Sequence, residues 1–373
     1  MTDCITTGWV SSGGAFVTRL EEWATEYFGA GGAVAVSSGT AALHTALLLA
    51  GVGHGDEVVV PTLTFIAPAN AVRYAGASPV FIDAEPEYWQ LHPARLEEFL
   101  VKRCRRERAG VVDLETGRVV KAVLPVNVLG HPCDMDSIVA VAHAAGLVVI
   151  EDATESLGSR YKGRPAGLLG DYGCVSFNGN KIATAGGGGL VVTRDSQAAE
   201  RARYLTTQAK DDPLEYVHRE VGFNYRLTNV QAAIGLAQVE RLDELVAGRR
   251  WVAEQYREAF ADVPGVEFMP EAPWARSNRW LSAIRVRPVG GGDSRSLLRV
   301  LAEHRVEARP LWQPLHRSPA HGGTTDGGDW IADRLNREVL CLPSSPSLTD
   351  EDIGRVAGLV SAFARERGRI RPT

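Results

Sequence analysis

One lysine and one acid in the middle of the chain have the residue types for a specific chemistry. Lys181 lies on a polar segment and is followed by a run of four glycines, residues 186–189, while Asp152 comes just after the apolar run 147–150. A lysine amine can form a Schiff base with the aldehyde of pyridoxal phosphate. A carboxylate can keep the pyridine nitrogen of that cofactor protonated. On these two residues alone, a plain surface loop at Lys181 remains an open interpretation.

A candidate anion site lies at residues 37–40, where a predicted strand meets the start of a predicted helix. Free backbone N–H groups and the helix dipole favour an anion at such a point. Gly39 would let the backbone approach a phosphate, and the Thr40 hydroxyl can donate to it. A simple N-cap explains the same residues, because Ser and Thr often cap helices. The segment lacks the lysine of a P-loop, so we do not expect a nucleoside triphosphate site.

Further candidate residues lie at or after predicted strand ends, where open α/β sheets bind their ligands. Phe65 could stack on a flat cofactor ring, or it could be a core aromatic, which is the commoner fate of such a residue. Glu155 follows Asp152 by three residues, so the two carboxyls would face one cavity if a helix begins there. A capping pair at that helix start is an equally open interpretation. The glycine run 186–189 favours close backbone packing, because a strand pattern follows it directly.

The elements that must position these residues alternate between strands and helices. We expect strands at 33–36, 57–60, 80–83, 121–126, 147–150, 174–177 and 189–193, and helices at 40–50, 66–75, 135–145 and 229–258. This alternation predicts an α/β fold around a large, mixed, mostly parallel sheet. The 373 residues exceed what one hydrophobic core usually serves. We therefore expect a large domain at 1–245 and a smaller α+β domain at 246–373.

Composition and charge narrow the class of protein. The net charge of −5, from 40 basic and 45 acidic residues, gives no reason to expect nucleic-acid binding. No apolar run is long enough to span a membrane, and no signal peptide is visible at the N-terminus. The five cysteines are scattered without a CxxC pair, so we expect reduced thiols, a cytoplasmic location and no metal centre.

Ordered motifs along nearly the whole chain resemble those of the DegT/DnrJ/StrS aminotransferases. Each motif alone is weak evidence, but the ordered set is specific. The matching segments are Ser38–Ala41, Pro61–Phe65, Glu151–Ala153, Ser176–Gly189, Gly222–Arg226, Arg309–Trp312, Pro314–His316, Leu342–Pro343 and Ser347–Thr349. The resemblance implies the fold-type I architecture of pyridoxal phosphate enzymes, working as a homodimer with shared active sites.

The resemblance also implies roles for individual residues at the cofactor. Lys181 would bind the cofactor covalently and Asp152 would pair with the pyridine nitrogen. Phe65 would stack on the ring, and Glu155 would lie at its hydroxyl, where many relatives have Gln or His. The residues expected to hold the phosphate are Thr40, Ala41 and Ser176, with Asn224 reaching the partner subunit's phosphate. Because the family also contains dehydratases that have histidine in place of the lysine, Lys181 favours transamination.

Several stretches resemble the branch of this family that acts on UDP-linked 4-keto sugars. They are Gly8–Ser12, Ser176–Lys181, Thr206–Lys210 and Leu342–Ser345. The implied reaction moves an amino group from L-glutamate to a keto group of a nucleotide-linked 4-keto-6-deoxy sugar. The residues expected to bind that substrate are Trp9, Lys210, Trp312 and His316. A non-nucleotide ketone, such as an aminocyclitol precursor, and a dehydratase reaction remain alternatives.

Overall fold

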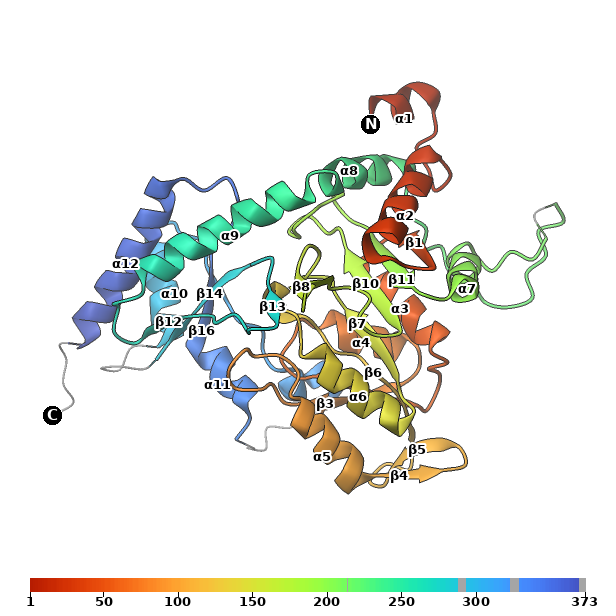
Figure 1. Ribbon diagram of the computed structural model, residues 1–373, viewed down its shortest axis with the longest axis horizontal. Helices are drawn as coiled ribbons and strands as arrows, with labels where there is room; N and C mark the ends of the chain where they lie inside the picture. Colours follow the sequence, from red (N-terminus) through yellow and green to blue (C-terminus); the bar gives the residue numbers. More distant parts are fainter. Residues whose placement is uncertain (213, 288–292, 323–328, 369–373) are drawn as a thin grey trace.

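A nine-stranded mixed sheet forms the centre of the computed structural model, which describes residues 1–212, 214–287, 293–322 and 329–368 (Figure 1). The strand order is β1-β11-β10-β7-β6-β2-β3, and the hairpin β4–β5 pairs with β6. Its strands are β1 (Gly32–Val36), β2 (Glu57–Pro61), β3 (Ser78–Ile82), β4 (Cys104–Glu107), β5 (Gly110–Asp113), β6 (Val119–Val123), β7 (Val148–Asp152), β10 (Tyr172–Ser176) and β11 (Gly189–Thr193). Strands β3, β2, β6, β7 and β10 run parallel, so the predicted mostly parallel α/β fold is confirmed.

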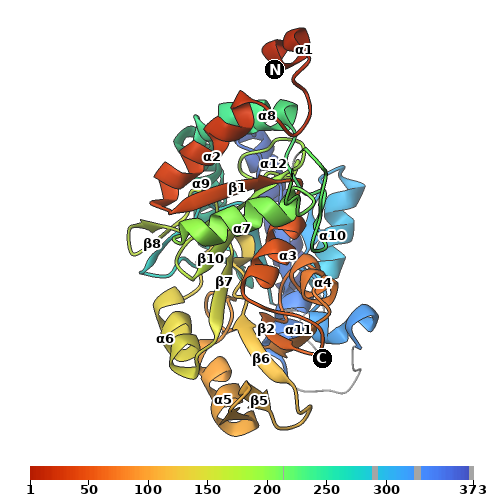
Figure 2. The same ribbon diagram turned by 90° about the vertical axis from the view of Figure 1, so that its right-hand side faces the viewer.

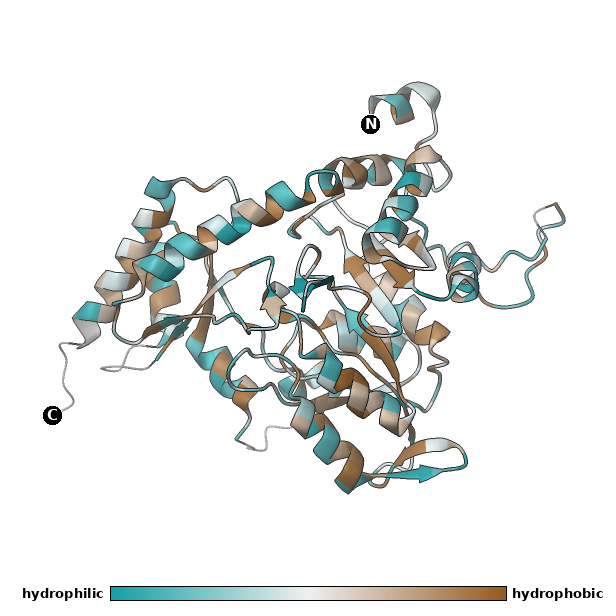
Figure 3. Cartoon of the chain, in the orientation of Figure 1, coloured by the Kyte–Doolittle hydropathy of each residue, from teal (hydrophilic) through white to brown (hydrophobic). Residues whose placement is uncertain are grey.

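Helices cover both faces of this sheet, which agrees with the mostly apolar residues of its central strands. Figure 2 shows α5 and α6 on one side and α3 and α4 on the other, and Figure 3 shows the hydrophobic residues gathered in the strands. The helices packed around the sheet are α2 (Ala15–Phe28), α3 (Gly39–Leu49), α4 (Ala67–Tyr74), α5 (Pro93–Arg103), α6 (Met135–Ala145), α7 (Ser196–Thr206) and α8 (Asn229–Val239). A short helix, α1 (Thr2–Thr7), projects from the body.

A smaller antiparallel sheet follows in the last third of the chain, in the order β12-β14-β16-β15. It comprises β12 (Val266–Phe268), β14 (Ser282–Val286), β15 (Arg309–Pro310) and β16 (Val339–Leu342), with helices α9 (Leu242–Ala259), α10 (Ser294–Glu303), α11 (Ile331–Glu338) and α12 (Asp350–Gly368). Helices α9, α10 and α12 share a hydrophobic core with this sheet. The predicted division after residue 245 falls inside α9 and stays a prediction.

The helix predicted over 229–258 is wrong in one respect, because two helices occupy that range. The chain leaves helical geometry at Arg241, whose φ is −112° and ψ 19°. Helix α8 packs on α2 beside the large sheet, whereas α9 packs on α12 and β14 of the small sheet. The start of α9 still lies in the core of the large sheet, through Leu242 and Val246. Its later residues Val252 and Tyr256 lie in the core of the small sheet, so α9 spans both cores.

Short elements complete the description. They are β8 (Arg160–Tyr161), β9 (Arg164–Pro165) and β13 (Ala275–Arg276), which form a three-stranded sheet, and the 3-10 turns η1 (Val128–Gly130), η2 (Leu315–Arg317) and η3 (Pro319–His321). Within the described residues, no helix combines the length and the apolar character that a membrane crossing requires.

Candidate active site

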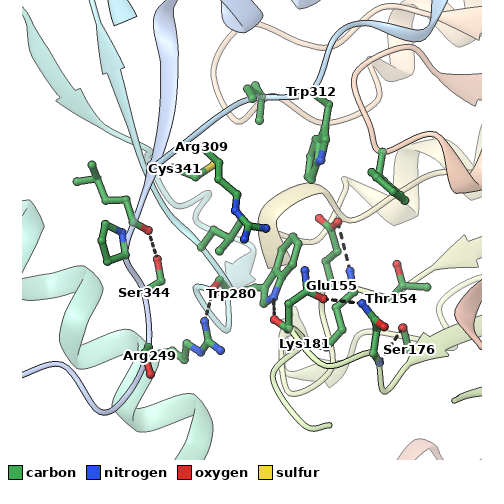
Figure 4. A pocket seen from close by; sticks show the side chains of 18 of the residues that line it. Thr154, Glu155, Ser176, Lys181, Arg249, Trp280, Arg309, Trp312, Cys341 and Ser344 are labelled. Carbon is green, nitrogen blue, oxygen red and sulfur yellow. Dashed lines mark hydrogen bonds and ion pairs between the residues drawn. The ribbon is translucent and has the colours of Figure 1, made fainter. Parts of the chain in front are cut away.

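A cavity of about 1010 Å³ lies where the parallel strands end and the small sheet approaches them. Its lining includes Asp152 at the end of β7, Ser176 at the end of β10 and the first residues of α3. Residues of β15 and β16 contribute from the small sheet (Figure 4). This is the carboxyl edge of an open α/β sheet, where ligands are expected to bind.

Lys181 reaches this cavity from a tight turn between β10 (Tyr172–Ser176) and β11. Its backbone N–H donates to Asn178 O at 3.0 Å, which closes the turn. The Nζ atom lies 3.6 Å from Glu155 Oε1 and 4.1 Å from the ring centroid of Trp280. The strands on either side of the turn run antiparallel. The lysine is therefore held inside the cavity, and the interpretation as a plain surface loop is wrong.

Asp152 is a buried acid, 1% exposed, whose Oδ1 accepts one hydrogen bond from Thr154 N at 3.0 Å. Burial raises the pKa of Asp152, while the Thr154 N–H and Lys181 oppose that rise. Within the described ranges it makes no ion pair. A carboxylate in this position is stabilised by a cationic group placed in the cavity.

The preceding residue, Glu151, is buried, and its carboxylate has hydrogen-bond partners within the fold. Its carboxylate accepts hydrogen bonds from Asn127 Nδ2 at 2.8 Å, Gly167 N at 2.9 Å and Leu169 N at 2.6 Å. Successive residues of a strand point to opposite faces. Glu151 thus holds the surrounding loops together, and Asp152 is the acid of this pair that faces the cavity.

Glu155 also lines the cavity, so the two carboxyls face one space as the first interpretation proposed. No helix begins there, because residues 154–158 form turns. Glu155 Oε2 accepts from Leu129 N at 2.8 Å, and Leu129 adopts a left-handed conformation with φ 59°. Burial raises the pKa of Glu155 to about 7, although Lys181 opposes the rise.

The predicted anion site lies at the start of α3, next to the end of β10. Ser38 caps α3 by accepting from Ala41 N at 3.0 Å, so the N-cap interpretation holds for Ser38 and uses the N–H of Ala41. Gly39 and Thr40 line the cavity. A Cβ atom on Gly39 would lie only 2.9 Å from Ser176 Cβ, which shows how closely these backbones approach. The predicted contact of Ala41 with a phosphate stays a prediction.

The close packing predicted for the glycine run is present at Gly188 and Gly189, whereas a Cβ on Gly186 would meet nothing within 4 Å. A Cβ on Gly189 would lie 2.6 Å from Val175 O and 2.9 Å from Gly39 N. Gly188 has φ +108° and pairs with Ser38 in an isolated bridge. Small residues are therefore required where the lysine turn meets the start of α3.

These residues fit pyridoxal phosphate. A small-residue cradle at a helix start suits a phosphate. The buried Asp152 suits a cationic ring nitrogen, and Lys181 opens into the same cavity as an amine for the aldehyde. Phe65 also lines the cavity and is 53% exposed, so the core-aromatic interpretation is wrong.

Five predicted residues do not line this cavity in the part of the chain that the structure describes: Trp9, Ala41, Lys210, Asn224 and His316. Trp9 is 64% exposed, Asn224 is exposed, and Lys210 Nζ lies over the ring of Tyr216 at 4.5 Å. His316 is buried, with Nδ1 2.7 Å from Thr62 Oγ1. Of the predicted substrate residues, Trp312 alone lines the cavity, and the roles of the others stay predictions.

Sequence reasoning missed several lining residues: Thr154, Asn178, Asn180, Arg249, Trp280 and Arg309. Trp280 and Arg249 are separated from Lys181 by long stretches of chain, and no local pattern marks them. Signals for the others were available: Thr154 directly follows the Glu151–Ala153 motif, Asn178 and Asn180 lie within Ser176–Gly189, and Arg309 begins the segment Arg309–Trp312.

The large mixed sheet, the lysine turn and the buried acid define a pyridoxal phosphate enzyme of fold-type I. Residues 1–361 match the DegT/DnrJ/EryC1/StrS aminotransferase family, and the chain belongs to it. It is 42% identical to EpsN of Bacillus subtilis over 361 residues, covering 95% of this chain and 90% of that one. Identity to the GDP-perosamine synthase of Caulobacter vibrioides is 39% over 355 residues, covering 95% and 91%.

A solved structure agrees with this assignment. DesV from S. venezuelae superposes with a TM-score of 0.87 at 31% identity, covering 97% of this chain and 92% of that chain. The protein is therefore a pyridoxal phosphate-dependent sugar aminotransferase.

Proposed function

We propose that this enzyme transfers an amino group from L-glutamate to a keto group of a nucleotide-linked 4-keto-6-deoxy sugar, with UDP as the expected nucleotide. The observation that supports it most is the placement of Lys181 and Asp152 in one cavity with the Gly39–Thr40 cradle. Because that cavity continues past Trp312 to the small sheet, it has room for a ligand far larger than the cofactor.

In this proposal each residue of the cavity has one task. Pyridoxal phosphate, when bound, supplies an electron sink next to the carbon that loses its proton. Lys181 Nζ would remove the proton from the α-carbon of the donor as general base and would deliver it to the C4′ carbon of the cofactor as general acid. With the keto sugar it would move a proton in the opposite direction. Asp152 keeps a positive charge on the ring nitrogen. Gly39, Thr40 and Ser176 bind the phosphate, and Phe65 packs on the ring face.

The nucleotide and the sugar are open to a direct test. The name of the Caulobacter relative indicates a GDP-linked product, so both UDP- and GDP-linked keto sugars belong in the panel. Purified enzyme, L-glutamate and each keto sugar nucleotide are incubated, and mass spectrometry detects replacement of oxygen by an amine. Amination of a non-nucleotide ketone alone would support the aminocyclitol alternative. Loss of a hydroxyl without amination would support the dehydratase.

We also propose that the enzyme is a homodimer with shared active sites. Large apolar side chains are exposed on two segments, the connection after α1 at the top of Figure 1 and the loop after α7 (Ser196–Thr206), which projects at its right. Leu214 is 86% exposed and Val221 81%, and Trp9 and Tyr216 are also exposed. Asn224 lies on the second segment, where Arg226 anchors the chain through Glu21 at 2.8 Å. A partner subunit would cover these side chains and receive Asn224.

Mixed dimers test the sharing. Lys181→Ala and Asn224→Asp subunits are each expected to be inactive alone. A hybrid dimer would have both lesions in one site and an intact second site, so roughly a quarter of the sites should recover after random exchange. Absence of recovery, with subunit exchange shown by mass, would count against a shared site.

Separate half-reactions test the predicted substrate residues. Lys210→Ala and His316→Ala should slow the keto-sugar half-reaction more than the glutamate half-reaction, because glutamate is too small to reach the nucleotide end. Stopped-flow absorbance measures each. Equal loss in both half-reactions for His316→Ala would show that its bond to Thr62 holds the fold.

A further inference from the structure

Trp280 contacts the lysine turn in two different ways. Its indole ring lies under the Lys181 ammonium, with Nζ 4.1 Å from the ring centroid. Its Nε1–H donates to the backbone carbonyl of Asn180 at 2.7 Å, and Asn180 directly precedes Lys181. One side chain therefore fixes both the backbone before the lysine and the end of the lysine side chain (Figure 4).

Trp280 is itself held firmly. It is 3% exposed and lies just before β14 (Ser282–Val286) of the small sheet. Its backbone N–H donates to Asn278 Oδ1 at 2.9 Å, and its carbonyl accepts from Arg249 Nη1 at 2.8 Å. The indole therefore approaches Lys181 from a rigid support.

Asn278 connects Trp280 with the other group that contacts the lysine. It is completely buried, and its Nδ2 donates to the carbonyl of Glu155 at 2.9 Å and of Leu157 at 2.8 Å. The Glu155 carboxylate and the Trp280 ring thus share one hydrogen-bonded anchor. The Lys181 ammonium lies within reach of both groups.

A free lysine side chain has many rotamers, and ordering it costs conformational free energy. An ammonium over an indole face is attracted by the ring quadrupole, more strongly when water is excluded. A support that holds the amine near its reaction partner therefore raises the effective concentration of the amine. The aromatic face and the Asn180 hydrogen bond together provide that support.

We propose that Trp280 is a positioning residue for Lys181, which holds the amine where it captures the aldehyde of the cofactor. In that capture the ammonium first gives a proton to the Glu155 carboxylate, whose Oε1 lies 3.6 Å away. The neutral Nζ then adds to the aldehyde carbon, a C=N bond forms, and the aldehyde oxygen leaves as water. The inference depends on cofactor binding alone and is independent of which sugar the enzyme uses.

Cofactor capture by the apoprotein tests this role. Apoprotein is mixed with pyridoxal phosphate, and the rate is followed by the absorbance band of the lysine-bound cofactor. Affinity for pyridoxamine phosphate, which has no aldehyde, is measured in parallel and reports whether the pocket is intact. Trp280→Leu should slow capture about tenfold, and Trp280→Phe, which keeps a weaker aromatic face but loses the N–H, about threefold. Pyridoxamine phosphate affinity should stay within about twofold of wild type.

Trp251→Leu is the control. Trp251 lies on α9, is 39% exposed and does not line the cavity. This variant should capture the aldehyde at the wild-type rate. Wild-type capture by both Trp280 variants would overturn the proposal. So would a loss of pyridoxamine phosphate affinity in Trp280→Phe equal to its loss of capture rate, because that result would make Trp280 part of the pocket wall only.

Discussion

The lysine cavity and the projecting segments differ in what surrounds their side chains: the charged groups of the cavity are buried or have partners, whereas apolar side chains of the segments are exposed. In the cavity, Lys181 and Glu155 have partners within one chain, and Asp152 is buried. On the segment after α1 and the loop after α7, Trp9 and Leu214 are exposed. Lys181, Glu155 and Asp152 thus meet within one chain. In the proposed dimer, the partner subunit would cover the exposed side chains of the projecting segments and would receive Asn224 at its cofactor phosphate. Four predictions test that contrast, beginning with the largest effect.

Removing the amine should abolish the chemistry of the cavity. Lys181→Ala should lower the transamination rate by roughly a thousandfold or more, because the nucleophile and the proton carrier are lost together. Borohydride should fix the cofactor on Lys181 in wild type and leave this variant unlabelled, as peptide mass mapping would show. Lys162→Ala, which removes a surface lysine paired with Asp136, is the control and should behave as wild type. Labelling of another lysine in Lys181→Ala would contradict the assignment.

Replacing Asp152 should have the second-largest effect on the transamination rate. Asp152→Asn keeps the shape of the side chain and removes its charge, so the ring nitrogen would lose its counter-charge. The rate should fall by roughly a hundredfold to a thousandfold. Cofactor binding should persist, as an absorbance titration would show. Glu151→Gln should instead lower the melting temperature, because that carboxylate accepts three hydrogen bonds inside the fold. If Asp152→Asn and Glu151→Gln had the same effects on rate and melting temperature, the assignment of a catalytic role to Asp152 and a structural role to Glu151 would be wrong.

Loss of exposed apolar side chains should act on assembly. The double variant Leu214→Ser, Tyr216→Ser should raise the dimer dissociation constant by roughly a hundredfold while leaving the melting temperature of the subunit unchanged. Sedimentation over a concentration series measures it. Val101→Ser replaces another exposed apolar residue, on α5 (Pro93–Arg103), and should leave association unaltered. A similar shift with Val101→Ser, or none with the double variant, would contradict the proposed interface.

The smallest effect concerns Glu155, whose pKa burial raises to about 7. Because the folded pKa lies above the unfolded value, the stability that this group contributes is present below about pH 4.5 and is lost as the pH rises to about 7. The side chain of Glu155→Gln does not titrate, so this variant keeps the stability that wild type loses. Its unfolding free energy relative to wild type should therefore increase by about 2 kcal/mol from pH 5 to pH 8. Denaturant unfolding of the apoprotein at each pH measures the gain. A constant difference across that range would be inconsistent with a raised pKa, and the exposed Glu87→Gln serves as control.

Much of the architecture was predictable because its signals are local. Apolar runs such as Val58–Val60 and turns such as residues 178–181 fall within a few residues of one another. The position of Asp152 at a strand end and of Lys181 on the next turn followed from such patterns. The break at Arg241 was not predictable, since buried apolar residues continue at helical spacing on both sides of it.

The sequence by itself determined the α/β alternation, the lysine, the acid and the ordered motifs that indicate the family. Only the tertiary structure decided which side chains meet them. Trp280 lies about 100 positions from the Asn180 carbonyl that it binds, and Leu129 supplies its N–H to Glu155 from a left-handed turn. The tertiary structure also separated Glu151 from Asp152, since the alternation of a buried strand turns one acid into the fold and the other into the cavity. Periodicity reports which face of an element is buried, whereas the partner across that face is fixed only when distant elements pack.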